Sequence, residues 1–293
     1  MPVLPGILLY LCATLLGTTM SAVVHEVSAT VPLGQIIFWR SGAALLPILA
    51  YMAIRRELPA ALSTAHPGKH LTRSLFGVIS MALSFLSLRY LNVANAQALG
   101  YLAPIIVLPM AALIARERIG PMVIGATALG FAGVLAMIWE SLRLPCNGAL
   151  AGILAGLGFA FTMAFVRVHV KTMTATERPA TIAFYFAVTG TLVGLASRPF
   201  GWVSPDPQTL MLLTGAGLLG GLTHIAATEA VARVPVSVLA PFDYTGLVWA
   251  LLFDILIFAT PPGPLGLAGA FAITGAVLWV SLAQRRAVAT APR

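Results

Sequence analysis

Long apolar stretches separated by short polar connections run through the chain from end to end. An α-helix needs about 20 predominantly apolar residues to cross roughly 30 Å of hydrocarbon. Ten stretches reach this length: residues 5–23, 33–54, 72–90, 93–114, 120–139, 148–168, 180–198, 208–231, 235–258 and 263–282. The pattern therefore predicts an all-α integral membrane protein with ten transmembrane helices.

Composition supports this class and excludes others. Of the residues, 59% are hydrophobic and 9% are charged, whereas a soluble domain carries roughly 25% charged residues. The net charge of +8 comes from scattered basic clusters without interleaved aromatics, so no nucleic-acid partner is expected. Cys12 and Cys146 have no neighbours at metal-ligand spacing, and we expect neither a metal nor another cofactor.

Basic residues alternate between the two ends of the predicted spans. In membrane proteins, Lys and Arg are enriched in cytoplasmic connections. If the N-terminus is cytoplasmic, 13 of the 17 basic residues fall on the cytoplasmic side: Arg55, Arg56, Lys69, Arg73, Arg116, Arg118, Arg167, Lys171, Arg178, Arg233, Arg285, Arg286 and Arg293. We therefore predict that both termini are cytoplasmic.

Short sequence matches relate the two halves of the chain. Leu-Ala-Pro at residues 102–104 recurs at 239–241, and Gly-Pro at 120–121 recurs at 263–264. The matches divide the chain into 1–143 and 144–293, with five predicted spans in each half. An odd number of spans places the halves in opposite orientations, which is the inverted repeat common in secondary transporters. We expect the repeats to surround a central cavity.

Pro104 and Pro241 occupy matching positions within the fourth and ninth spans. Proline lacks an N–H and clashes with the carbonyl four residues back, so both spans should kink there. Freed carbonyls at mid-membrane depth are tolerated where protein or a watery cavity covers them. The kinks either shape the cavity and permit bending during transport, or merely bend their helices.

Asp243 is the most informative polar residue of the ninth span. It lies about 12 Å along that span at ~1.5 Å per residue, where a carboxylate should face the interior of the bundle. It could bind a substrate ammonium group or take a driving proton, or it could make a structural hydrogen bond. His224 in the eighth span could approach Asp243, or serve only as a contact between helices.

Other candidate binding residues lie on the third, fourth and ninth spans. Gln97 and Tyr101 share a face with Pro104, because spacings of four and three keep side chains on one side of a helix. Both could hydrogen-bond a polar substrate, while Phe85 and Tyr244 could supply apolar or aromatic walls. The alternative for all four is ordinary packing.

Arg40 lies within the second span. We expect its side chain to reach the membrane interface, or to pair with Asp254 at similar depth. The candidate cavity residues include one carboxylate and few cations, an arrangement that favours a zwitterion or a neutral-to-cationic solute over an anion.

Several stretches resemble the drug/metabolite transporter superfamily, EamA-type. Residues 88–96, Leu-Arg-Tyr-Leu-Asn-Val-Ala-Asn-Ala, and the later Ala103-Pro104 are similar to its first repeat. Residues 240–245, Ala-Pro-Phe-Asp-Tyr-Thr, are similar to the matching segment of its second repeat. The likeness covers the whole chain and implies a ten-helix fold in the bacterial inner membrane, with a cavity lined mainly by the third, fourth, eighth and ninth spans.

The resemblance implies a secondary transporter of small molecules and no enzymatic activity. We expect export of neutral or aromatic amino acids by alternating access, by a monomer or weak dimer, with the proton as candidate coupling ion. The alternative is an importer of another small metabolite, such as a nucleoside, a vitamin or a cation. An intramembrane enzyme acting on lipids or prenyl groups is disfavoured, because the nine acidic residues are scattered along the chain.

Overall fold

The computed structural model describes residues 3–103, 106, 125, 128–133, 135–136, 139, 148–173, 176–233, 242 and 245–289. Within these ranges every regular element is helical. The α-helices are α1 (Val3–Val27), α2 (Leu33–Ile54), α3 (Pro67–Tyr90), α4 (Val93–Gly100), α7 (Ala149–Met173), α8 (Pro179–Ala196), α9 (Pro207–Arg233), α11 (Thr245–Leu256) and α12 (Pro264–Ala289), with short 3-10 turns η1 (Ala60–Leu62) and η2 (Arg198–Phe200). The all-helical prediction is confirmed.

The described helices follow the predicted spans closely. Five are long and apolar enough to cross a membrane: Leu4–Val27, Leu33–Ile54, Pro67–Tyr90, Ala149–Val166 and Pro207–Ala227. Shorter apolar helices cover Ala180–Ala196, Thr245–Leu256 and Pro264–Ala276. Half of the predicted fifth span, 120–139, lies outside the described residues.

Local sequence signals explain where the helices begin. Pro67 and Pro264 occupy the first positions of α3 and α12, where proline suits the helix because the first N–H groups have no helical partner. Asn92 caps α4, since its side chain accepts a hydrogen bond from the backbone N–H of Asn95 at 3.0 Å. Such a cap satisfies one of the otherwise unpaired donors of the first turn.

Glycines allow α9 to approach α2 closely. A Cβ atom at Gly217 would lie 2.9 Å from the backbone carbonyl oxygens of Trp39 and Arg40, and one at Gly221 would lie 2.8 Å from that of Ala44. Small residues at such a spacing are typical of helix contacts within membranes, because they let two backbones come together.

The most extensive helix contacts match when the two predicted halves are exchanged. In chain order, α1 corresponds to α7, α2 to α8, α3 to α9 and α4 to α11. The pair α1–α9 then becomes α7–α3, the pair α2–α9 becomes α8–α3, and α1–α11 becomes α7–α4, and all six pairs are in contact. The pairs α2–α8 and α4–α11 map onto themselves and are in contact as well. Two structurally related halves packed about a two-fold axis would give this pattern of contacts.

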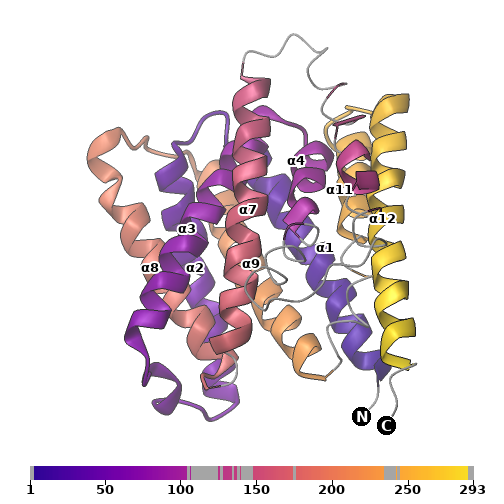
Figure 1. Ribbon diagram of the computed structural model, residues 1–293. Helices are drawn as coiled ribbons and strands as arrows, with labels where there is room; N and C mark the ends of the chain where they lie inside the picture. The colour runs from indigo at the N-terminus through magenta and orange to yellow at the C-terminus, as the bar shows by residue number, and fades with distance from the viewer. Residues whose placement is uncertain are drawn as a thin grey trace.

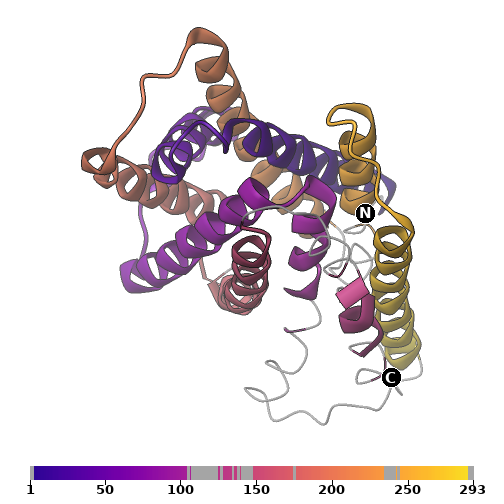
Figure 2. The same cartoon turned by 90° about the horizontal axis from the view of Figure 1, so that it is seen from above.

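The bundle has two ends that we name by their place in Figure 1. The lower end holds the start of α1, the end of α12 and the connections α2–α3 and α7–α8 (Figure 1). The upper end holds the connections α1–α2 and α8–α9. Seen from above, α8 and α12 lie on opposite sides of the bundle (Figure 2). Both termini therefore lie at the same end, as the prediction of cytoplasmic termini requires.

Candidate functional site

A cavity of about 410 Å³ lies between α2, α8 and α9. It is lined by Ile48, Tyr51, Arg55, Arg56, Glu57, Arg178, Ala180, Ala183, His224, Ile225 and Glu229. The residues at its rim belong to the lower-end connections. His224 lies nine residues before the end of α9, which is about 14 Å at ~1.5 Å per residue. The cavity therefore reaches from the lower end well into the bundle.

The rim of the cavity is mainly basic. Arg55, Arg56 and Arg178 are exposed, and the Arg55 Nε lies 3.9 Å from a carboxylate oxygen of Glu57. On the wall between α2 and α9, the Tyr51 hydroxyl donates a hydrogen bond to the Glu229 carboxylate. The entrance therefore carries three arginines and two carboxylates that already have partners, and its net positive charge attracts anions.

His224 joins the cavity to a buried arginine of α2. The Arg40 guanidinium donates from Nη2 to the His224 Nε2 at 3.2 Å. A guanidinium can only donate, so Nε2 accepts and the imidazole proton lies on Nδ1. The His224 ring also meets the Phe186 ring edge to face, with centroids 5.7 Å apart.

Phe186 brings a second arginine to the same place. The guanidinium carbon of Arg73 lies 4.1 Å from the Phe186 ring centroid, and that of Arg40 lies 5.6 Å from it. The two residues are only 8% and 6% exposed. Nε and Nη1 of both have no hydrogen-bond partner among the described residues. Two buried cations thus share one aromatic ring and keep free donors.

The predicted pairing of Arg40 with Asp254 is wrong. Both oxygens of the buried Asp254 carboxylate bind the start of α4: Oδ1 accepts from the N–H of Val93 at 3.0 Å and Oδ2 from that of Ala94 at 2.6 Å. These N–H groups carry the positive end of the α4 dipole and hold the carboxylate away from Arg40. The sequence places Asp254 and Arg40 at similar depth, but only the packing shows which helix each one meets.

Arg73 was grouped with the basic residues of the cytoplasmic side, but its side chain is buried within α3. The third span was expected to begin at residue 72, whereas α3 begins at Pro67. Arg73 therefore lies almost two turns inside the helix and is buried. The expectation of few cations in the interior is wrong for this part of the bundle. Proline at the start of α3 was the available signal, because it marks a first helical position.

The sequence-predicted site residues lie in different parts of the bundle. His224 lines the cavity. Phe85 is 2% exposed within the hydrophobic core. Gln97 donates to the Ser21 hydroxyl of α1 at 3.3 Å, and the hydroxyl of Tyr101 lies against Gly246 of α11. Asp243, Tyr244, Pro104 and Pro241 lie outside the described residues.

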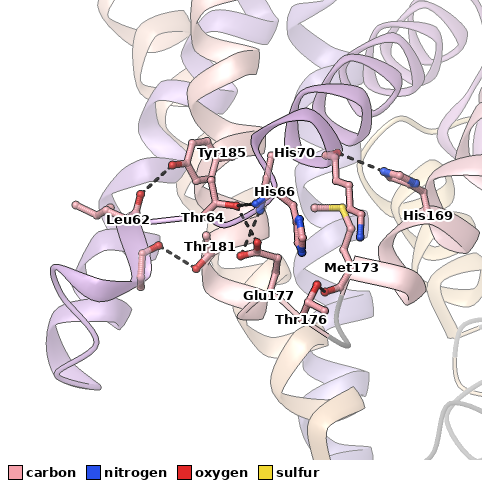
Figure 3. A network of polar contacts seen from close by, with 12 residues as sticks. Leu62, Thr64, His66, His70, His169, Met173, Thr176, Glu177, Thr181 and Tyr185 are labelled. Atoms are coloured by element: carbon pink, nitrogen blue, oxygen red, sulfur yellow. Dashed lines mark hydrogen bonds and ion pairs between the residues drawn. The ribbon is translucent and has the colours of Figure 1, made fainter.

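A polar network closes part of the lower end (Figure 3). The Thr64 hydroxyl donates to the Glu177 carboxylate at 2.8 Å, and the His70 Nε2 lies 3.5 Å from its other oxygen. The hydrogen bond from Thr64 and the neighbouring His70 hold the pKa of the buried Glu177 carboxyl below its ordinary value. Nearby, the hydroxyls of Thr181 and Tyr185 donate to the carbonyls of Ala61 and Leu62. The network ties the α2–α3 connection to α8 and the connection before it.

A smaller contact joins the helices at the upper end. The Gln35 side chain donates from Nε2 to the Val203 carbonyl at 2.8 Å and accepts from the Val203 N–H at 3.0 Å. This pair of bonds ties the start of α2 to the α8–α9 connection. Each end of the bundle therefore has a contact between the two halves of the chain.

The described residues offer no group of three or more His, Cys, Asp or Glu side chains that could hold a metal ion. The chemistry available around the cavity consists of the buried arginines, the neutral imidazole of His224 and the aromatic face of Phe186. These groups can bind and orient a solute.

Comparison with known proteins identifies the class to which this arrangement belongs. A solved crystal structure with 18% sequence identity superimposes with a TM-score of 0.69, covering 96% of this chain and 98% of the other, and so shares the fold. The pseudopaline exporter CntI of Pseudomonas aeruginosa is 28% identical over 96% of this chain and 97% of its own length. A riboflavin transporter of Rhizobium johnstonii is 30% identical over 87% and 83%. An S-adenosylmethionine uptake transporter of Rickettsia prowazekii is 25% identical over 86% and 83%.

The family comparison covers almost the whole chain. The model of the EamA-like transporter family matches residues 4–139 and again residues 150–282. The resemblance noted in the sequence is thereby confirmed. The chain is a multi-pass membrane transporter, not an enzyme, and it belongs to the EamA-like transporter family.

Proposed function

We propose that the chain is a secondary transporter that exports an amino acid or a closely related small metabolite by alternating access. The observation that carries the proposal is the cavity that leads from the lower end of the bundle to His224. In a transporter fold, a cavity that enters the bundle from one end fits a binding site exposed to one side of the membrane. The lower end would face the cytoplasm of a bacterium, as the distribution of basic residues favours.

An inverted repeat, which we propose for this chain, would support alternating access. The most extensive helix contacts map onto one another when the halves are exchanged, and the family model matches once in each half. Residues 1–143 and 144–293 would then be the two repeats. In such folds transport proceeds as one repeat or bundle rocks against the other around a fixed site.

The amino-acid assignment rests on the groups that line the cavity and on those that lie behind His224. The free donors of Arg40 and Arg73 suit the carboxylate that every amino acid carries. The rings of Phe186 and Tyr51 suit an apolar or aromatic side chain. Neutral and aromatic amino acids therefore remain the first substrates to test. Export is favoured because CntI, which matches along nearly its whole length, is named as an exporter.

The alternative is import of another small metabolite. It is favoured by the names of two relatives, a riboflavin transporter and an S-adenosylmethionine uptake transporter. For either direction we propose the proton as coupling ion, with Asp243 as the candidate carboxylate in the ninth span. Gln97, Tyr101, Phe85 and Tyr244 remain candidate substrate contacts, with Pro104 and Pro241 as candidate hinges in a protein that acts as a monomer or weak dimer.

Flux through purified protein in liposomes tests the proposal. Labelled L-phenylalanine, L-leucine, L-glutamate and riboflavin are loaded inside, and efflux is measured with and without a pH gradient. Saturable amino-acid flux that exceeds the flux of riboflavin is expected. Riboflavin flux without amino-acid flux would support the alternative, and no flux of any of the four solutes by folded protein would refute the amino-acid proposal.

A further inference from the structure

Arg40 and Arg73 form an unusual pair for the interior of a membrane protein. Isolated charges are expensive there and normally pair with an opposite charge or line a functional pathway. Within the described residues, the ion pairs are Arg55–Glu57 and His70–Glu177, and neither involves the two buried arginines. Among the described residues their contacts are the Phe186 ring and the neutral imidazole of His224, and neither group carries a counter-charge.

The surrounding residues are shaped to hold both guanidinium groups in place. A Cβ atom at Gly220 of α9 would lie 3.0 Å from the Arg40 Nε. At Gly77 of α3, a Cβ atom would lie 3.1 Å from the Arg73 Nη1 and 2.9 Å from the Phe186 ring. The two glycines thus leave the space that the guanidinium groups and the ring occupy. The arginines come from α2 and α3, and the ring between them comes from α8.

The pair is next to a route from solvent. The cavity from the basic rim ends at His224, whose Nε2 is 3.2 Å from Arg40. An anion that enters past Arg55 and Arg178 passes two carboxylates that already have partners, Glu57 and Glu229, and then reaches His224 with Arg40 behind it. Guanidinium groups are the donors that proteins use to bind carboxylate and phosphate oxygens.

We propose that Arg40 and Arg73, which both contact the Phe186 ring, form the subsite that binds the anionic oxygen group of a dissolved solute. The proposal rests on the transporter function above and names the chemistry of its substrate. A solute with one carboxylate compensates one guanidinium and leaves the other buried without a counter-charge, which is costly. Solutes with two anionic oxygen groups therefore bind more tightly than solutes with one, and solutes with none bind weakly.

Thermal unfolding of the purified protein in neutral detergent tests the subsite without any transport step. The probes are succinate with two carboxylates, L-phenylalanine with one, phenethylamine with none, and inorganic phosphate. A ligand that binds only the folded state raises the unfolding temperature. We expect the largest rise with succinate or phosphate and none with phenethylamine. The same rise with phenethylamine, or no rise with either anion, would overturn the proposal.

Arg40→Gln and Arg73→Gln locate the effect, and Arg89→Gln is the control, since Arg89 is an exposed arginine of α3. Each of the first two changes should weaken succinate binding by about tenfold or more, as expected for the loss of a charged hydrogen-bonding partner. Neither should lower the unfolding temperature of the ligand-free protein, because it removes an uncompensated buried charge. A lower ligand-free unfolding temperature would mean that the arginines are structural. Arg40→Lys and Arg73→Lys serve if a glutamine variant fails to fold, and should give an intermediate succinate shift.

Two further experiments distinguish a lipid headgroup from a dissolved anion as the ligand, and failure of the transport proposal from failure of the subsite proposal. Measurements repeated with added phosphatidylglycerol test a lipid headgroup, and a shift with this lipid alone would overturn the assignment to a dissolved solute. Liposome flux tests the transporter function separately. Anion binding that depends on both arginines, without flux of any solute, would refute the transport proposal alone. Phenylalanine flux that is unchanged in both glutamine variants, without an anion shift, would refute the subsite alone.

Discussion

Replacing Asp254 by asparagine should destabilise the contact between α11 and α4 at the upper end. The Asp254 carboxylate is 1% exposed and accepts from the N–H groups of Val93 and Ala94 at 3.0 and 2.6 Å. An asparagine has one acceptor oxygen, which can accept from only one of these two N–H groups. Its NH2 group would face the other N–H, and two donors cannot form a hydrogen bond with each other. The change therefore removes one charge-assisted hydrogen bond and leaves one buried N–H unpaired, at a cost of about 2–4 kcal/mol in unfolding free energy.

Equilibrium unfolding in mixed micelles, followed by tryptophan fluorescence, measures this cost. Asp206→Asn is the matched control, because the Asp206 carboxylate also accepts from a backbone N–H at the start of a helix, that of Thr209 at 2.6 Å, but is exposed. This control should have a much smaller effect, since water can satisfy the freed N–H. An unfolding free energy of Asp254→Asn within 0.5 kcal/mol of the wild type, about the usual range for neutral surface changes, would contradict the capping role.

Three other perturbations test the fold. The folded state favours the ionised form of Glu177, because the pKa of its carboxyl lies below the ordinary value of 4.5. The carboxylate therefore stabilises the fold above pH 4.5, and this stabilisation is lost as the pH falls through the lowered pKa. Glu177→Gln should therefore flatten the fall in unfolding temperature below about pH 4.5, and an unchanged acid profile would exclude the network. Gly217→Ala should cost about 1–3 kcal/mol by overpacking α9 against the backbone of α2, whereas Gly215→Ala, where a Cβ atom meets nothing within 4 Å, should be neutral or stabilising in the same unfolding assay. Gln35→Ala removes the hydrogen bonds to Val203 and should loosen the upper end. In alternating access the cavity at the lower end should then be open less often, so a cysteine placed at position 225, in a background without the native cysteines, should be alkylated more slowly. An unchanged alkylation rate would argue against coupling of the two ends.

The fold could be predicted from the sequence because its physical signal is local. A run of about 20 apolar residues has few stable alternatives to a membrane-spanning helix. Proline and asparagine then mark the first turns, as Pro67 and Asn92 do. The boundary of the third span was misjudged because polar residues of the first helical turns do not raise the mean hydropathy.

The candidate site could be predicted only in part, since it depends on which helices meet. His224 was identified because a histidine within an apolar span is rare, and it lines the cavity. Arg40 was equally visible, but its partner was assigned by depth alone. Depth does not distinguish α9, which supplies His224, from α11, which supplies Asp254. Phe186 gave no signal at all, because an aromatic residue in an apolar span usually indicates packing.

The contacts at the two ends are related in the same way as the helices. At the lower end, Thr64 of the α2–α3 connection binds Glu177 of the α7–α8 connection. When the two halves are exchanged, the α2–α3 connection corresponds to α8–α9, and the α7–α8 connection corresponds to α1–α2. Val203 of α8–α9 binds Gln35, in the first turn after α1–α2. The two ends are therefore fastened by corresponding parts of the chain that differ in chemistry: a buried carboxylate with a histidine at one end, and a neutral amide at the other. Because the chemistry differs, protonation of Glu177 at low pH should weaken the lower contact, whereas the neutral amide contact of Gln35 should not respond to pH.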